Sequence, residues 1–114
     1  MTVPQNEACP LSGFLNIFGD AWTWVVVKEA FEGTKRFNDF QRNTGMARNV
    51  LSDRLSRLIT NGILSKTPAG PKRFSYELTA RGRSLRPLMQ SMSLWSKEHI
   101  AIGTSATSSP PAAA

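Results

Sequence analysis

The sequence has few of the residues that build disulfides and metal sites, and it has no long hydrophobic run. Its one cysteine, Cys9, cannot form an internal disulfide framework. Its one histidine, His99, has no nearby cysteine, histidine or paired carboxylates with which to bind a metal. No segment offers the roughly 20 apolar residues that cross a bilayer, and no Lys or Arg before Lys28 supplies the basic start of a secretory signal. We therefore expect a cytoplasmic protein without a metal.

Catalytic signatures are missing as well. The sequence contains no glycine-rich phosphate loop and no plausible pair of nucleophile and base. Its 114 residues, 40% hydrophobic and 19% charged, have the size and composition of one compact domain. We therefore expect neither enzyme activity nor a cofactor.

Positive charge is abundant and unevenly distributed. The chain has 14 Lys and Arg against 8 Asp and Glu, a net charge of +6 with a pI near 10.3. Residues 28–86 hold 13 of the basic residues and five of the acidic ones, so this middle segment alone carries +8. Such a segment is either a solvated surface or a surface that faces a polyanion such as nucleic acid.

The first third of the chain predicts two helices. Apolar residues at helical spacing form one stripe over residues 11–18, and a glycine follows. Asp20 can cap a second helix from residue 21 to about 31, which Gly33 would end. Residues 23–27 are β-branched and aromatic enough for a strand, but the two helix boundaries favour a helix. Because its apolar residues lie on every side, we expect this helix to be central and buried.

The next segment predicts a helix-turn-helix. Asn38 and Gln41 form a capping-box pattern, so a short helix should begin at Asn38 and end by Gly45. A longer helix follows, and Asn61-Gly62 should end it; this dipeptide could also form a hairpin turn, but the helical periodicity before it favours a helix end. The inner face of the longer helix would comprise Val50, Leu51, Leu55, Leu58 and Ile59.

A hairpin and a last helix complete the predicted order. Residues 63–67 and 73–78 are short extended runs, separated by residues 68–72, which contain two prolines and a glycine. Thr79 can cap the last helix, in which we expect Pro87 to cause a kink rather than a break between two elements. The expected fold is mainly α with a small β-hairpin (α+β), a winged helix-turn-helix over residues 9–101. Residues 1–8 should form a flexible arm and residues 102–114 a disordered tail.

The chain resembles the HxlR-type regulators of bacteria, a branch of the MarR-like winged-helix family. The resemblance covers roughly residues 9–96. It rests on Cys9-Pro10, Gly19-Asp20-Ala21-Trp22-Thr23, Lys35-Arg36-Phe37-Asn38-Asp39-Phe40, Leu51-Ser52-Asp53-Arg54-Leu55 with Leu58 and Asn61-Gly62, and Tyr76-Glu77-Leu78-Thr79 followed by Gly82, Leu85 and Pro87. Each string alone is a weak signal, but their order and spacing together are specific.

The resemblance implies a homodimer that binds double-stranded operator DNA, with the first and last helices at the subunit interface. The apolar stripes of these two helices agree with it, because one small domain has too little core to cover both. Alternatively, both helices only cap one monomeric core. The expected interface residues are Leu11, Phe14, Leu15, Phe18, Leu85, Leu88, Met89, Met92 and Trp95.

Residues that point away from the inner face of the longer helix should read the major groove. Arg48 can pair with guanine and Asn49 with adenine, whereas Ser52 and Ser56 could contact either phosphate or base. Asp53 should orient Arg57 rather than read a cytosine, and Arg54 should bond to a neighbouring helix or a phosphate. The full recognition set is Arg48, Asn49, Ser52, Asp53, Arg54 and Ser56, and the expected contacts to the DNA backbone and from the wing are Lys35, Arg36, Arg42, Lys72 and Arg73.

The sequence departs from the family pattern in two places. Ala47 stands where many members have a hydroxyl that caps the recognition helix, so its first amides need water or a phosphate as acceptor. The hairpin tip is short, which favours phosphate contact over insertion into the minor groove.

Three further hypotheses stay open at this stage. Cys9 is either a buried hydrophobe or a sensor of thiol-reactive electrophiles, as in several members of the family that it resembles. Four aromatic residues could line a small-molecule effector pocket but are more typical of core: Trp22, Trp24, Phe14 and Phe18. The rival to a nucleoid-associated regulator is a winged-helix module that binds an acidic protein or RNA without reading DNA.

Overall fold

A computed structural model describes residues 9–100 of the chain. The flexible arm and disordered tail expected at residues 1–8 and 102–114, and the last residue of the expected domain, lie outside these described residues. The elements follow in the order α1 (Pro10–Phe18), α2 (Ala21–Phe31), α3 (Phe37–Thr44), α4 (Arg48–Thr60), β1 (Leu64–Pro68), β2 (Phe74–Leu78), α5 (Ala80–Arg83) and α6 (Arg86–His99). The winged helix-turn-helix arrangement is confirmed.

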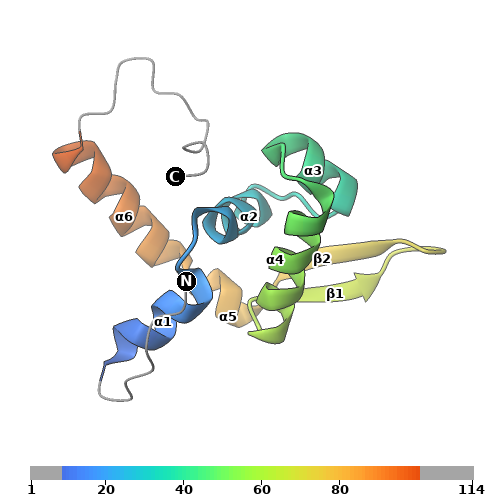
Figure 1. Ribbon diagram of the computed structural model, residues 1–114, viewed down its shortest axis with the longest axis horizontal. Coiled ribbons are helices and arrows are strands. Elements are labelled where there is room, and N and C mark those ends of the chain that lie inside the picture. Colours follow the sequence, from blue (N-terminus) through green and yellow to red (C-terminus); the bar gives the residue numbers. More distant parts are fainter. Residues whose placement is uncertain (1–8, 101–114) are drawn as a thin grey trace.

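The elements form a body with two arms (Figure 1). Helices α2, α3 and α4 pack together with the base of the hairpin, whose tip extends to one side of this body. Helices α1 and α6 project on the side away from the hairpin tip. The molecule therefore presents the hairpin tip and the two projecting helices at opposite ends.

Helix α2 has the boundaries and the central position that the sequence predicts. The Asp20 carboxylate accepts hydrogen bonds from the backbone amide of Thr23 at 2.8 Å and from its hydroxyl at 2.9 Å, which caps the helix. At the other end Gly33 has φ +97°, a conformation that suits glycine. Val26 and Val27 are completely buried against α3, α4 and β2. The strand alternative for this segment is therefore excluded.

The hydrophobic core lies among α2, α3, α4 and the base of the hairpin. It consists of Phe18, Val26, Val27, Phe40, Met46, Leu51, Leu55, Leu58, Ile63, Leu64 and Tyr76. Three residues of the predicted inner face of α4 are fully buried, and the other two, Val50 and Ile59, pack against the core from its edge. Helix α4 ends at Thr60, just before Asn61-Gly62, as predicted. Gly62 (φ +74°) follows the helix end and does not form a hairpin turn.

The predicted capping box at Asn38 is wrong. Helix α3 begins one residue earlier, at Phe37, and Arg36 occupies the cap position without a side-chain hydrogen bond. Phe37 packs against the core, and its burial fixes the start of the helix more strongly than the polar pattern does. The end of α3 is as predicted, with Gly45 left-handed at φ +73° and its amide bonded to the carbonyl of Gln41 at 2.8 Å.

The two strands pair antiparallel, with Leu64 opposite Leu78 and Lys66 opposite Tyr76. Each strand begins one residue later than predicted, and Pro68, expected in the loop, is the last residue of β1. The Tyr76 amide donates to the carbonyl of Lys35 at 2.8 Å, so the segment before α3 holds the free edge of β2. This bond fixes the hairpin relative to the helix-turn-helix.

The single kinked helix predicted at the end of the chain is wrong, because the segment forms two helices. Thr79 caps α5 as expected, accepting from the amide of Gly82 at 3.0 Å. Gly82 packs so tightly that a Cβ there would lie 2.2 Å from the carbonyl oxygen of Ile63. The chain then turns at Ser84 and Leu85, and α6 begins with Pro87 in its first turn, where the missing amide removes no helix hydrogen bond.

Candidate nucleic-acid interface

The outer face of α4 carries the residues that the sequence predicts for base reading. Arg48, Asn49, Ser52, Asp53 and Ser56 are all exposed, whereas Leu51, Leu55 and Leu58 between them are buried. The amino-terminal turn of α4 has no side-chain cap, because the methyl side chain of Ala47 at the cap position cannot accept a hydrogen bond. Its first amides therefore remain available to an external acceptor such as a phosphate oxygen.

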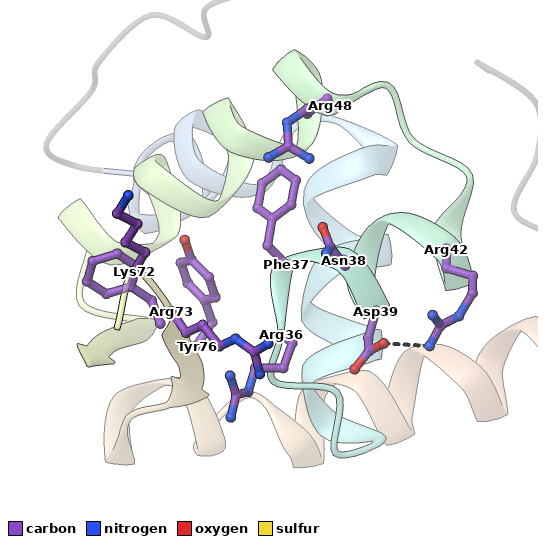
Figure 2. Close-up of a pocket in the computed structure, with 10 residues that line it drawn as sticks. Arg36, Phe37, Asn38, Asp39, Arg42, Arg48, Lys72, Arg73 and Tyr76 are labelled. Atoms are coloured by element: carbon purple, nitrogen blue, oxygen red, sulfur yellow. Dashed lines mark hydrogen bonds and ion pairs between the residues drawn. The ribbon is translucent and has the colours of Figure 1, made fainter. Parts of the chain in front are cut away.

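A cationic cleft adjoins this face (Figure 2). It has a volume of about 580 Å³ and lies between the starts of α3 and α4 and the tip of the hairpin. Five of its lining side chains are basic and one is acidic. The lining residues are Arg36, Phe37, Asn38, Asp39, Arg42, Arg48, Lys72, Arg73, Phe74 and Tyr76.

The fold brings together basic residues that are distant in the sequence. Arg36 and Arg42 of the α3 region, Arg48 of α4, and Lys72 and Arg73 of the hairpin line this one cleft. Four of the five backbone-contact candidates, together with one base-reading candidate, therefore share a single surface. The fifth backbone candidate, Lys35, lies outside the cleft lining, and its Nζ is 3.8 Å from Oε1 of Glu77.

The turn at the hairpin tip is tight and directs its charges toward the cleft. The Ala69 amide donates to the Arg73 carbonyl at 2.9 Å, and the Arg73 amide donates to Gly70 at 3.1 Å. Lys72 has φ +57°, a left-handed conformation that is uncommon for residues other than glycine. This compact tip presents Lys72 and Arg73 as its charges, as expected for a short wing.

Arg54 has a structural partner. From the sequence, its partner could be either a neighbouring helix or a phosphate. In the structure the Arg54 Nε lies 3.1 Å from Oδ2 of Asp20, the cap residue of α2. Its Nη1 lies 2.8 Å from Oδ2 of Asp53, and its side chain is only 21% exposed. Arg54 thus anchors α4 to the start of α2 rather than pointing outward with the base-reading candidates.

Arg57 belongs to the same cluster. Its Nη1 lies 3.6 Å from Oδ2 of Asp20 and 3.9 Å from Oδ2 of Asp53, so the predicted pairing of Asp53 with Arg57 is present at long range. Its Nη2 donates to the carbonyl of Asn16 in α1 at 3.5 Å. Arg54 and Arg57 together connect α4 to both α1 and α2.

The Asp20 carboxylate is kept ionised by this cluster. Burial opposes ionisation, but the hydrogen bonds from the Thr23 amide and hydroxyl and the positive charge of Arg54 outweigh it, so the pKa of Asp20 is lowered. The charged form of Asp20 therefore stabilises the native state.

Sequence analysis missed the aromatic part of the interface. Phe37, Phe74 and Tyr76 line the cleft, the Arg48 guanidinium lies 4.6 Å from the centroid of the Phe37 ring, and Lys66 lies 4.3 Å from that of Phe74. The available signal was a pair of basic residues followed directly by a phenylalanine, at 35–37 and again at 72–74. That pattern is typical of surfaces that bind nucleic acid.

The expected interface residues differ in their exposure. Phe18 is 5% exposed and belongs to the core of its own chain, and Phe14, Leu85 and Met89 pack against that core. Phe18 therefore has almost no surface to offer a partner. Leu15 is half-buried, and the exposed members are Leu11, Leu88, Met92 and Trp95, together with Leu94 and Ile100, which were not predicted.

Trp22 and Trp24 pack against the core, as the core interpretation requires. The Trp24 indole donates to the carbonyl of Phe18 at 3.0 Å, and its ring contacts the rings of Phe14 and Phe18. Neither tryptophan lines the cationic cleft.

Cys9 occupies the cap position of α1 and is half-buried. The amide and hydroxyl of Ser12, followed by the amide of Leu11, lower the pKa of its thiol. These groups lower it by donating toward the sulfur, although the geometry is not that of a regular helix cap. The thiol therefore carries more negative charge near neutral pH than an ordinary cysteine.

Residues 9–100 contain neither a metal-binding cluster nor a helix that could span a membrane. No group of three or more His, Cys, Asp and Glu in this range could hold a metal ion. None of the helices there has the length and apolar character that a membrane span requires.

Comparison with known proteins places the chain in a family. The family model described as HxlR-like helix-turn-helix matches residues 17–103. Rv3095 of Mycobacterium tuberculosis, named an HTH-type transcriptional regulator, is 35% identical over 88 residues, 75% of this chain and 56% of its own. YvaP of Bacillus subtilis, named likewise, is 30% identical over 100 residues, 84% of this chain and 93% of its own. The chain thus spans little more than half the length of the mycobacterial relatives.

Solved structures agree in fold. The crystal structure of PA1607 superposes with a TM-score of 0.76 at 30% identity, over 94% of this chain and 82% of that one. The redox regulator HypR in its reduced form gives 0.72 at 27% identity, over 79% of this chain and 92% of that one. The chain therefore belongs to the HxlR-like helix-turn-helix family, whose matched members are named as transcriptional regulators.

Proposed function

We propose that this protein is a transcriptional regulator that binds a pseudo-palindromic DNA operator as a homodimer. The observation that carries the proposal is the continuity of the cationic cleft with the outer face of α4, since Arg48 belongs to both. A duplex whose major groove receives the start of α4 would bring its phosphates to the cleft and the hairpin tip.

In this proposal the side chains have two kinds of role. Arg48 and Asn49 read base edges, while Ser52 and Ser56 contact base or phosphate. Arg54 holds α4 in position by its ion pair with Asp20, and Asp53 supports Arg54 by a second ion pair. The phosphate contacts come from Lys35, Arg36, Arg42, Lys72 and Arg73.

The exposed apolar residues of the projecting helices support the homodimer. Leu88, Met92 and Trp95 follow one another at spacings of four and three along α6, and all are exposed in the single chain. Leu11 of α1 is 59% exposed. Contact with a second copy would remove this apolar surface from water.

Cys9 is the residue through which the proposed regulator would sense a chemical signal. HypR, a structural relative known in reduced and oxidised forms, is named a redox regulator. In this chain a thiol of lowered pKa lies at the start of α1, and α1 contacts α4 through Arg57. We infer that an electrophile which modifies Cys9 changes the orientation of α1 and so weakens operator binding.

Operator selection followed by two substitutions tests the proposal. An operator selected from random duplexes should bind the wild type far better than random duplex at fixed salt. Arg48→Ala should relax the preference at one base pair of each half-site by about 1–3 kcal/mol. Lys72→Ala should instead weaken binding to all duplexes alike. It should also reduce the slope of the logarithm of the binding constant against the logarithm of the salt concentration by about one for each substituted site.

Arg81→Ala is the matched control, because Arg81 is exposed on α5 and does not line the cleft. It removes the same charge and should change neither property. Equal loss on every duplex for both Arg48→Ala and Lys72→Ala would contradict base reading by Arg48. Failure to select any preferred duplex would favour an acidic protein or RNA as the partner.

A further inference from the structure

Several basic residues of the helix-turn-helix region are held by carboxylates, whereas Arg48 is held by an aromatic ring. Arg42 pairs with Asp39, Arg54 with Asp20, and Lys35 with Glu77. Within residues 9–100, Arg48 has no carboxylate at ion-pair distance, and its guanidinium instead lies over the ring of Phe37, 4.6 Å from the centroid. Figure 2 shows the two side chains meeting at the edge of the cleft.

Phe37 is a fixed platform for this contact. It is the first residue of α3, it is half-buried, and it packs against the hydrophobic core. Arg48 is the first residue of α4. The contact therefore joins the starts of the two helices of the helix-turn-helix, and packing against the core restrains the ring.

A guanidinium over an aromatic ring is attracted by the quadrupole of the ring and forms no conventional hydrogen bond with it. The N–H donors of arginine lie in the guanidinium plane, and bidentate recognition of guanine uses the edge of that plane. An ion pair with a carboxylate would occupy the same donors. The ring thus restrains the Arg48 side chain without competing for the hydrogen bonds that read a base.

We propose that Phe37 is a specificity-determining residue that positions Arg48 for base recognition, without contacting a base itself. This inference rests on the proposed function. Restraint by the ring before binding reduces the conformational freedom that Arg48 must lose on the operator, and this benefit applies only where the guanidinium meets its preferred base. Phe37 therefore increases discrimination rather than general affinity.

Substitution of Phe37 tests the inference on the selected operator and on an operator changed at the base pair that Arg48 reads. Phe37→Leu should lower the ratio of the two affinities about two- to five-fold, the range expected for an exposed cation–π contact. Phe37→Tyr, which keeps the ring, should preserve the ratio. Loss of folded protein cannot mimic the effect, because it lowers both affinities equally and leaves their ratio unchanged.

A double-mutant cycle with Arg48→Ala separates this inference from the proposed function. In the Arg48→Ala background, Phe37→Leu should cause no further loss of discrimination. If Phe37→Leu keeps the full ratio in the wild-type background, or lowers it equally when Arg48 is absent, the positioning role is refuted and base reading by Arg48 stands. If Arg48→Ala itself leaves the ratio unchanged, base reading by Arg48 and its positioning by Phe37 both fail, whereas the proposed regulator fails only if no duplex is preferred.

Discussion

At the residue scale, the arginines of α4 have different tasks although they share one helix. Arg54 and Arg57 contact Asp20, and their charges are used within the molecule. Arg48 pairs with no carboxylate among the described residues, its guanidinium lies over the Phe37 ring, and the residue is exposed. Side-chain partners, and not the count of basic residues, therefore decide which arginine can contribute to DNA binding.

The cysteine gives a prediction at the same scale. Cys9→Ser should retain operator affinity but no longer release DNA when a quinone is added, because the nucleophilic thiolate is gone. In the wild type, release should slow as the pH falls through the lowered pKa of Cys9, at lower pH than for an ordinary thiol. Fluorescence anisotropy of labelled operator measures both effects.

Cys9 is the only cysteine of the chain, so Cys9→Ser removes every thiol. Ser12→Ala is the complementary variant, because it removes the hydroxyl that helps to lower the pKa while keeping the thiol. It should shift the pH dependence of release upward. Unchanged release from Cys9→Ser would show that the signal enters elsewhere.

At the element scale, α1, α2 and α4 are joined around the carboxylate of Asp20. Asp20 caps α2 and also contacts Arg54 and Arg57 of α4, while Arg57 reaches the carbonyl of Asn16 in α1. A change at α1 therefore has a direct route to the recognition helix through Arg57. The same junction makes Asp20 important for stability.

Asp20→Ala should lower the free energy of unfolding at pH 7 by at least the roughly 0.5–2 kcal/mol of a lost helix cap. Asp20→Asn should lower it less, since asparagine also caps helices but lacks the charge that Arg54 contacts. Because the folded pKa of Asp20 is lowered, the advantage of wild type over Asp20→Asn should be full above the unfolded pKa of about 4 and disappear as the pH falls through the folded pKa.

Urea denaturation between pH 7 and pH 2 measures this difference. Asp53→Asn is the control, because Asp53 also contacts Arg54 but is 56% exposed and caps no helix. Asp53→Asn should lower the free energy of unfolding much less than Asp20→Ala does. A pH-independent difference between wild type and Asp20→Asn would show that the carboxylate charge contributes nothing.

The sequence predicted those elements whose boundaries depend on local chemistry. Asp20 and Gly33 bound α2 by capping and by positive φ, and the periodicity of α4 gave both its length and its exposed face. Contacts distant in the sequence decided the errors. Core packing of Phe37 moved the start of α3, and the close fit of Gly82 on Ile63 accompanies the separation of α5 from α6.

The candidate site was predictable in part for the same reason. Helical periodicity identifies the outward residues of α4, but it does not show that the hairpin tip faces the starts of α3 and α4. That arrangement depends on the strand register and on the bond from the Tyr76 amide to the Lys35 carbonyl. The partner of Arg54 and the ring beneath Arg48 likewise required the folded chain.

At the scale of the whole molecule, charge and apolar surface are separated. Figure 1 shows the hairpin tip at one end and the projecting helices α1 and α6 at the other. The hairpin tip and the starts of α3 and α4 line the cationic cleft, whereas Leu11, Leu88 and Trp95 are exposed on the projecting helices. A partner chain on the projecting helices would leave both cationic surfaces open. We expect such a dimer to place two recognition helices about 34–36 Å apart, one turn of B-form DNA.

Hydroxyl-radical footprinting on the selected operator tests this central claim most directly, with a variant that weakens the dimer beside it. Leu88→Glu places a charge among the exposed apolar residues of α6, whereas Gln90→Glu adds the same charge elsewhere on that helix. Wild type and Gln90→Glu should protect two symmetric patches centred about 10–10.5 base pairs apart, or a whole multiple of that distance. Leu88→Glu should lose this paired protection. A single asymmetric patch with the wild type, or a spacing that is not a whole number of turns, would contradict the account.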